Sequence, residues 1–126
     1  MIVGIGMDIV SIERMKPWLN KPGLCSRYFH RNELNYAYAR GSVAAQSLAA
    51  RFAAKEAFLK ALGAGFAGMR LSEIYVENTD SGTPHLVVEG NAKEKTIQMG
   101  VNRIHLSLTH EHNLAAAQVV LENTNG

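Results

Sequence analysis

The sequence lacks several features that would mark it as exported, membrane-bound or disulfide-stabilised. It has one cysteine, Cys25, which cannot form a disulfide within the chain, and this agrees with a reducing compartment. No run approaches the ~20 consecutive apolar residues of a membrane span. The first residues lack the basic start and the small-residue cleavage site of an export signal. We therefore expect a cytoplasmic protein with no membrane partner.

Strong charge of either sign is also lacking. The formal net charge is +2, which is too small to indicate nucleic-acid binding, and aromatic residues do not alternate with basic ones as a base-stacking platform requires. With 47% apolar and 19% charged residues the composition is that of a folded domain. There is no internal repeat or low-complexity segment, so we predict one domain over residues 1–126, with residues 123–126 as a flexible tail.

The first segment, Ile2 to Val10, has the period-two pattern of a strand with one bulky and one nearly bare face. The bulky face consists of Val3, Ile5, Met7 and Ile9. Gly4, Gly6 and Asp8 form the other face, so Asp8 ends a strip without side chains. Glycines weaken a strand, and their presence indicates that a ligand or another backbone approaches this face closely.

The stretch Ala44 to Leu62 predicts one long helix that ends before Gly63. Lys55 falls inside its apolar stripe and Glu56 at the edge of the stripe. Burying a charge is costly unless it is paired, so these residues are candidates for function. The carboxylates of Asp8 and Glu56 together indicate a site for a hard cation. The simpler interpretation of Glu56 and Lys60 is an exposed i, i+4 ion pair worth about 0.2–0.5 kcal/mol.

The rest of the chain predicts short elements. We expect a helix capped by Ser11 and running through Leu19, a break at Pro22-Gly23, and helices over residues 32–40 and 91–99. Two hairpins are expected from strands at 71–78, 85–89, 103–109 and 114–121. The predicted fold class is α+β, with a mostly antiparallel sheet packed on the long helix.

Three further patterns each allow more than one interpretation. The segment from Gly63 to Gly68 matches the dinucleotide-binding spacing but follows a helix instead of a strand, so we reject that fold, although the loop could still offer backbone N–H groups to phosphate. His105, His110 and His112 could bind zinc, or could lie on an ordinary solvent-facing strand. A run of basic residues that contains no Asp or Glu is either a solvated surface or a docking site for an acidic partner; it contains Arg14, Lys16, Lys21, Arg27 and Arg31.

Four motifs together resemble the holo-acyl-carrier-protein synthases, the small class of the 4′-phosphopantetheinyl transferases. They are the GIGMDIVSIER segment ending at Arg14, the RFAAKEAFLKALG helix from Arg51 to Gly63, the Gly82-Thr-Pro84 turn, and HLSLTHE from His105 to Glu111. The resemblance spans nearly the whole chain in the order of the family. It departs from the family pattern at Thr83, where lysine is common, and at Thr109, where serine is common.

The resemblance implies an enzyme that transfers the 4′-phosphopantetheine arm of coenzyme A to a serine of apo acyl carrier protein, in support of fatty acid biosynthesis. Asp8 and Glu56 would hold Mg²⁺, and Lys60 would contact phosphate. Lys55 would do likewise or pair with an acid. The nucleotide end would lie against Gly63, Gly65, Pro84 and His105.

The resemblance also implies a homotrimer with active sites between neighbouring subunits, and an acidic carrier protein docked on Arg14, Lys21 and Arg27. A subunit boundary would then account for the bare glycine face beside Asp8. The serine proton could be removed by Glu56, by a metal-bound water or by a lysine. Two other functions are possible from the residues alone: a non-catalytic module that binds a nucleotide or an acidic partner, and a zinc hydrolase.

Overall fold

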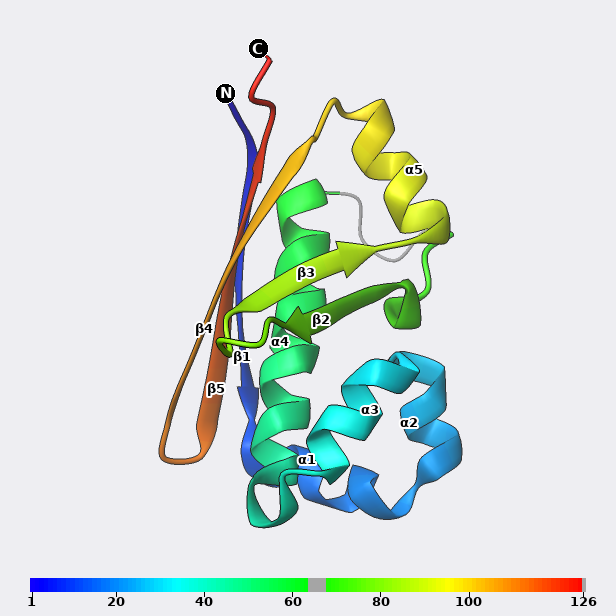
Figure 1. The fold of residues 1–126 in the computed structure, drawn as a ribbon, viewed down its shortest axis with the longest axis vertical. Helices are drawn as coiled ribbons and strands as arrows, with labels where there is room; N and C mark the ends of the chain where they lie inside the picture. Colours follow the sequence, from blue (N-terminus) through cyan, green and yellow to red (C-terminus); the bar gives the residue numbers. More distant parts are fainter. Residues whose placement is uncertain (64–67, 126) are drawn as a thin grey trace.

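The computed structural model describes residues 1–63 and 68–125 (Figure 1). The strands are β1 (Ile2–Ser11), β2 (Ile74–Asn78), β3 (Pro84–Val88), β4 (Arg103–Glu111) and β5 (Leu114–Glu122). The helices are α1 (Ile12–Met15), α2 (Pro22–Tyr28), α3 (Arg31–Tyr38), α4 (Ala44–Leu62) and α5 (Gly90–Gln98). Short 3₁₀ turns occupy Lys16–Asn20, Gly41–Val43 and Leu71–Glu73. This is the predicted α+β fold class.

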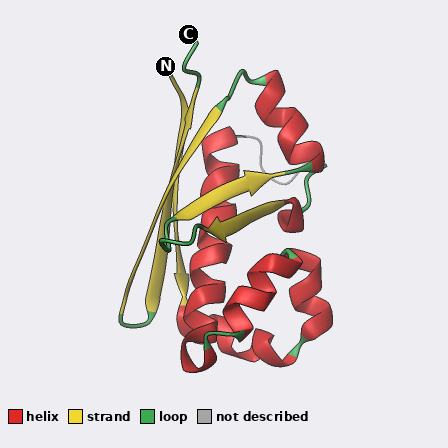
Figure 2. Cartoon of the chain, viewed as in Figure 1, coloured by secondary structure: helices red, strands yellow, loops and turns green. Residues whose placement is uncertain are grey.

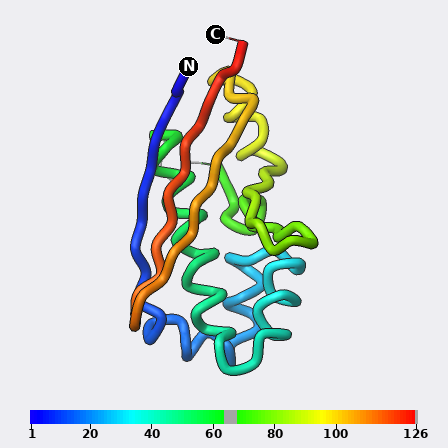
Figure 3. The backbone as a smooth tube through the Cα atoms, turned by 60° about the vertical axis from the view of Figure 1, so that its left-hand side comes forward, coloured from blue at the N-terminus to red at the C-terminus, as the bar shows by residue number. Residues whose placement is uncertain are grey.

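Two antiparallel sheets form the β structure. The larger has the strand order β1-β5-β4, and the smaller is the β2–β3 hairpin. All the helices lie on one side of the three-stranded sheet, with α4 directly against it (Figures 1 and 2). Because β5 is the middle strand, β1 and β4 are the two edges of the sheet, as the tube view also shows (Figure 3). Residues on β1 and on β4 are therefore separated by a strand.

Helix α4 is buried on almost every side. The sheet covers one side, while α3 and β2 cover another. Its apolar side chains Leu48, Phe52, Phe58, Leu59 and Leu62 belong to the hydrophobic core. Gly63 ends the helix in the left-handed conformation (φ 72°), as its sequence position predicts.

The bare face of β1 packs against the backbone of α4. A Cβ placed at Gly4 would overlap the carbonyl oxygen of Ala61, and one at Gly6 would overlap the carbonyl oxygen of Ala57. The approaching backbone therefore belongs to the same chain, and the expectation that a subunit boundary accounts for the glycine face is wrong. Asp8 is the next residue on this face, so the strand brings it to the surface of α4.

The opposite face of β1 is exposed. Ile5, Met7 and Ile9 have exposed fractions of 60%, 58% and 61%. The register aligns them with Val120, Gln118 and Ala116 of β5, so these residues share the outer face of the sheet. No helix or strand of the described residues covers that face (Figure 3). The outer face of β1 is therefore an exposed apolar surface.

Several predicted boundaries are wrong. Pro22-Gly23 is not a break, because Pro22 starts α2, where a residue without N–H is tolerated. The strand expected from Leu71 begins only at Ile74, after a 3₁₀ turn. Asn123 and Thr124 are not frayed: the Asn123 N–H donates to the Met1 carbonyl (2.8 Å), and the Thr124 N–H donates to Asn102 Oδ1 (3.0 Å).

Of the residues that the structure describes, no helix combines the length and the apolar character needed to cross a bilayer. Cys25 is a buried free thiol whose Sγ donates to the Trp18 carbonyl. Burial raises the pKa of this thiol, which keeps it protonated and unreactive.

Candidate active site

An acidic site forms where β1 meets α4. The side chain of Asp8 is only 18% exposed, and its Oδ1 accepts a hydrogen bond of 3.0 Å from Lys60 Nζ. The same ammonium donates to the carbonyl oxygen of Met7, also at 3.0 Å. Lys60 lies one turn after Glu56 on α4, so β1 and α4 bring two carboxylates and one lysine together.

Glu56 is electrostatically coupled to Asp8. Partial burial, and then the negative charge of Asp8, raise the pKa of Glu56, while Lys60 and Arg14 oppose that shift. The carboxylates of Asp8 and Glu56 are thus near enough for the charge of one to act on the other. The charge coupling agrees with the expected pairing of Asp8 with Glu56, which stays a prediction.

The residues present fit a magnesium ion. Mg²⁺ prefers oxygen ligands and is commonly held by one or two carboxylates, with water and substrate phosphates completing its shell. Asp8 and Glu56 supply that minimum. Within residues 1–63 and 68–125 no three side chains of His, Cys, Asp and Glu are grouped as metal ligands.

Lys55 does not belong to this site. Its side chain is fully buried, and its Nζ donates to Glu33 Oε1 and to the carbonyl oxygens of Leu71 and Ile74. Burial lowers the pKa of Lys55, and the charge of Glu33 acts against that shift. With all three ammonium protons donated, Lys55 has none left for a phosphate. The expectation of a nucleotide contact at Lys55 is wrong, and the alternative of pairing with an acid is confirmed.

Glu33, which no sequence pattern marks as buried or functional, completes this buried pair. Its Oε1 also accepts from the His30 N–H, and its Oε2 accepts from the Val76 N–H at 3.0 Å. All three ammonium protons and both carboxylate oxygens of the pair thereby have partners. The pair joins α3, α4 and β2, so its role is structural.

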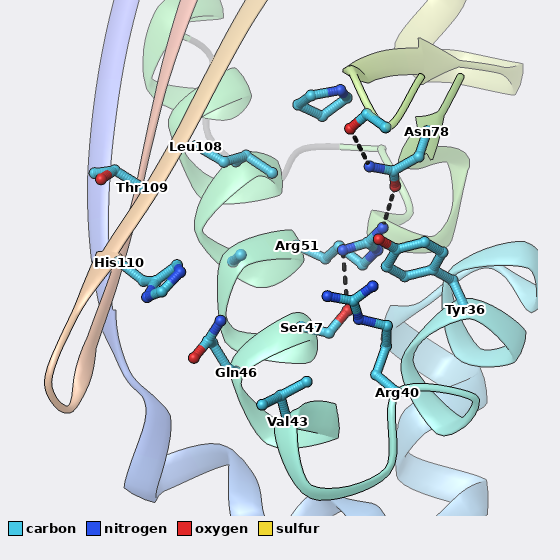
Figure 4. A pocket seen from close by; sticks show the side chains of 13 residues that line it. Tyr36, Arg40, Val43, Gln46, Ser47, Arg51, Asn78, Leu108, Thr109 and His110 are labelled. Atoms are coloured by element: carbon cyan, nitrogen blue, oxygen red, sulfur yellow. Dashed lines mark hydrogen bonds between the residues drawn. The ribbon is translucent and has the colours of Figure 1, made fainter. Parts of the chain in front are cut away.

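A basic pocket lies at the other edge of the sheet, between α3, α4, the β2–β3 hairpin and β4 (Figure 4). Its polar and charged lining residues include Tyr36, Arg40, Arg51, Asn78 and His110. Pro84, predicted to contact the nucleotide, also lines it. Arg40 and Arg51 were missed, and His110 was considered only as a zinc ligand. Arg51 carries the same sequence signal as Lys55, because it is a basic residue on the apolar stripe one turn earlier.

Arg51 is the fixed centre of this pocket. It is 4% exposed; its Nη1 donates to Ser47 Oγ at 3.0 Å and its Nη2 to Asn78 Oδ1. The guanidinium carbon stands 4.2 Å from the centroid of the Tyr36 ring, a cation–π distance. Its Nε is buried and has no partner among the described residues. A preorganised guanidinium suits phosphate recognition.

His105 lies on the other face of β4. It pairs with Val120 in register, and its ring donates through Nε2 to Glu122 Oε1 at 2.9 Å. Side chains alternate along a strand, so residues 105 and 110 point to opposite faces, and His110 is the one that lines the pocket. His105 therefore lies outside the pocket, and a nucleotide contact at His105 stays a prediction.

The remaining predicted site residues are only partly placed. Gly63 caps α4 and is exposed, while Gly65 lies outside the described residues. Arg14 on α1, Lys21 just before α2 and Arg27 on α2 are exposed, and these elements lie at the end of the molecule away from α5 (Figure 1). Arg14 is close enough to Glu56 to lower its pKa, so the basic surface begins beside the acidic site.

The three histidines considered for zinc do not converge. His105 is on the outer face of the sheet and His110 is in the pocket. His112 is in the β4–β5 turn with φ 52°, where its ring lies 3.7 Å from Glu111. The zinc interpretation has no geometric support in this arrangement.

Comparison with known proteins agrees with the fold and the motifs. The family model of the 4′-phosphopantetheinyl transferase superfamily matches residues 4–118. A holo-[acyl-carrier-protein] synthase of Treponema denticola is 49% identical over 122 residues, which cover 97% of this chain and 99% of that protein.

Solved structures agree as well. The holo-[acyl-carrier-protein] synthase of Neisseria meningitidis has a TM-score of 0.84 at 36% identity and covers 97% of this chain and 99% of its own. The synthase of Bacillus anthracis, in complex with CoA (3′,5′-ADP), has a TM-score of 0.80 at 38% identity, over 98% of this chain and 99% of its own. Matches of this extent leave one assignment: the chain belongs to the 4′-phosphopantetheinyl transferase superfamily.

Proposed function

We propose that this enzyme transfers the 4′-phosphopantetheine arm of coenzyme A to a serine hydroxyl of apo acyl carrier protein, in support of fatty acid biosynthesis. The serine oxygen forms a bond to the phosphorus that carries the pantetheine, and the bond from that phosphorus to the bridging oxygen breaks. The products are holo acyl carrier protein and adenosine 3′,5′-bisphosphate. The observation that carries the proposal is the convergence of Asp8, Glu56 and Lys60 in a chain of this family.

Asp8 and Glu56 are the residues proposed to hold Mg²⁺. When bound, the ion would neutralise charge on the diphosphate and align it for in-line displacement. Lys60 is exposed enough to place its ammonium on a phosphate oxygen, where it acts as a point charge. Positioning and electrostatic stabilisation then account for most of the rate enhancement.

The nucleotide end of coenzyme A is assigned to the basic pocket. Arg51, Arg40 and His110 offer donors for phosphate, and Pro84 forms part of the wall. The synthase of Bacillus anthracis in complex with CoA (3′,5′-ADP), at 38% identity, supports a nucleotide site in a protein of this fold.

The acidic site and the pocket lie at opposite edges of the three-stranded sheet, since Asp8 is on β1 and His110 is on β4. One subunit alone does not bring them together. We therefore propose a homotrimer in which the acidic site of one subunit faces the pocket of the next. The exposed outer face with Ile5, Met7 and Ile9 would supply the apolar contact between copies.

Acyl carrier protein is proposed to dock on Arg14, Lys21 and Arg27. All three are exposed, and Arg14 stands beside the acidic site, so an acidic partner bound there would bring its serine close to Asp8 and Glu56. The cytoplasm is the proposed compartment, in agreement with the free thiol of Cys25.

The test is mass spectrometry of apo acyl carrier protein incubated with coenzyme A, magnesium and the enzyme. The expected result is a carrier protein heavier by one phosphopantetheine, and no such product with Asp8→Asn. Glu94→Gln, an exposed carboxylate on α5, is the matched control and should retain full activity. An unmodified carrier protein with wild-type enzyme would refute the proposed reaction.

A mixing experiment tests the shared site separately. Asp8→Asn and Arg51→Met each disable one edge of the sheet, so neither should be active alone. After the two proteins are mixed and allowed to exchange subunits, about a quarter of the sites should combine an intact acidic edge with an intact pocket edge. A mixture as inactive as its components would place both halves of the site in one chain.

A further inference from the structure

The ammonium of Lys60 is bound by two oxygen atoms of the acidic site. It bonds to a carboxylate oxygen of Asp8 and to the carbonyl oxygen of Met7, both at 3.0 Å. A carboxylate and a carbonyl are the ligand types that a hard cation prefers. The side chain of Lys60 is 57% exposed, whereas that of Asp8 is 18% exposed, so the lysine is the mobile member of the pair.

Two adjacent carboxylates need a positive charge near them. Arg14 supplies part of it, since its charge favours the ionised form of Glu56, but the hydrogen bonds to Asp8 and Met7 come from Lys60. Lys55, the neighbouring lysine on α4, is fully committed to Glu33 and two carbonyls. Of the two lysines on α4, only Lys60 is therefore able to move between the acidic site and another ligand.

We propose that Lys60 is an internal counter-ion that a divalent cation displaces. In the metal-free enzyme its ammonium balances Asp8 and Glu56. Metal binding removes the need for that charge at Asp8 and frees the ammonium, which is then available to a phosphate oxygen of the substrate. Lys60 would thus weaken metal binding and make its own phosphate contact depend on the metal. The inference depends on the proposed metal site at Asp8 and Glu56.

The test is calorimetric titration of Mg²⁺ into the full chain without coenzyme A. Lys60→Met should bind Mg²⁺ about tenfold more tightly than wild type, because a competing charge close to the site is gone. Lys60→Arg should remain near wild type, since it keeps a cation at the same position. Lys93→Met changes the net charge equally, but at an exposed position on α5, and should leave the affinity unchanged.

A second readout follows the ammonium itself. The side-chain ¹⁵Nζ resonance of Lys60 should shift when Mg²⁺ is added to wild type, while that of Lys93 should not. Equal Mg²⁺ affinities for wild type and Lys60→Met, with binding lost in Asp8→Asn, would overturn the counter-ion role and leave the metal site standing. If none of the proteins bound Mg²⁺ saturably, both the counter-ion role of Lys60 and the proposed metal site would be refuted.

Discussion

Gly6 of β1 and Ala57 of α4 are in backbone-to-backbone contact. A Cβ at position 6 would overlap the carbonyl oxygen of Ala57 and stand 2.7 Å from the amide nitrogen of Ala61. Because Asp8 is two residues further along the same face of β1, this contact fixes the distance between the strand that carries Asp8 and the helix that carries Glu56.

We predict that Gly6→Ala destabilises the protein by about 1–3 kcal/mol, because the added methyl group forces β1 away from α4. The measurement is urea unfolding. Gly23→Ala is the matched control, since a Cβ at position 23 meets nothing within 4 Å and alanine favours the helix. Equal losses in the two variants would mean that the close contact does not constrain the sheet.

Glu56→Gln should stabilise the metal-free protein at neutral pH. The pKa of Glu56 is raised in the folded state, so the folded state binds more protons than the unfolded state at pH values between the two pKa values. Stability therefore falls as the pH rises from about 4.3, the ordinary pKa of a glutamate, through the raised pKa. Glutamine cannot ionise and removes this loss.

The measurement for Glu56→Gln is the melting temperature in EDTA from pH 4 to 8. The melting temperatures of the variant and wild type should converge at acid pH and differ increasingly toward neutral pH. When EDTA is replaced by Mg²⁺, the difference should disappear, because the ion stabilises wild type alone. A constant gap at every pH would contradict the assignment. Transfer activity should fall by about 100-fold or more, equivalent to roughly 2.7 kcal/mol of transition-state stabilisation.

Lys55→Met should cost about 3–5 kcal/mol of stability, since it leaves the buried carboxylate of Glu33 without its counter-ion. Lys16→Met removes an ion pair of 2.9 Å with Glu13 in which both side chains are more than half exposed, and should cost less than about 1 kcal/mol. Urea unfolding of both variants tests the contrast. Similar small losses would show that Glu33 finds another partner.

The two histidines of β4 should differ in nucleotide binding. His110→Ala should weaken binding of adenosine 3′,5′-bisphosphate by about tenfold, because the pocket loses one hydrogen bond to a charged group. His105→Ala should leave this affinity unchanged. The affinities are compared by calorimetry, under conditions in which the two variants elute identically by size exclusion. If His105→Ala weakened binding and His110→Ala did not, the nucleotide contact would be assigned to His105.

Arg14→Glu should slow association with acyl carrier protein, and the association rate of wild type should fall as salt is added, since surface charges are screened. Lys93→Glu makes the same charge change on α5, at the other end of the molecule, and should have little effect (Figure 1). Stopped-flow measurements at several ionic strengths test this. A wild-type rate that does not respond to salt would exclude electrostatic docking.

The periodicities predicted the elements that carry the acidic site. Alternation in β1 placed Asp8 at the end of a bare strip, and helical spacing placed Glu56 at the edge of the buried surface of α4. Both predictions depend only on local geometry, which the sequence determines directly. Ser11 was likewise predicted as a helix cap, and its Oγ accepts a bond from the Arg14 N–H at 3.4 Å.

The pocket could not be predicted in the same way. Alternation separates His105 from His110, but which other elements lie beside β4 depends on the strand order β1-β5-β4 and on the placement of the β2–β3 hairpin, which are long-range properties. Glu33 is a further case, because a single acidic residue in a short polar helix gives no sign of burial. Its partner is 22 residues away in sequence and meets it only in the folded chain.

The contact of β1 with α4 has a consequence for how the enzyme tolerates change. Where two main chains touch with no side chains between them, there is no layer of side chains that could repack. Core substitutions elsewhere can shift helices against one another by small amounts, but the spacing of this strand and this helix is insulated from them. The alignment of the two carboxylates should therefore drift less than the surrounding core among variants that still fold.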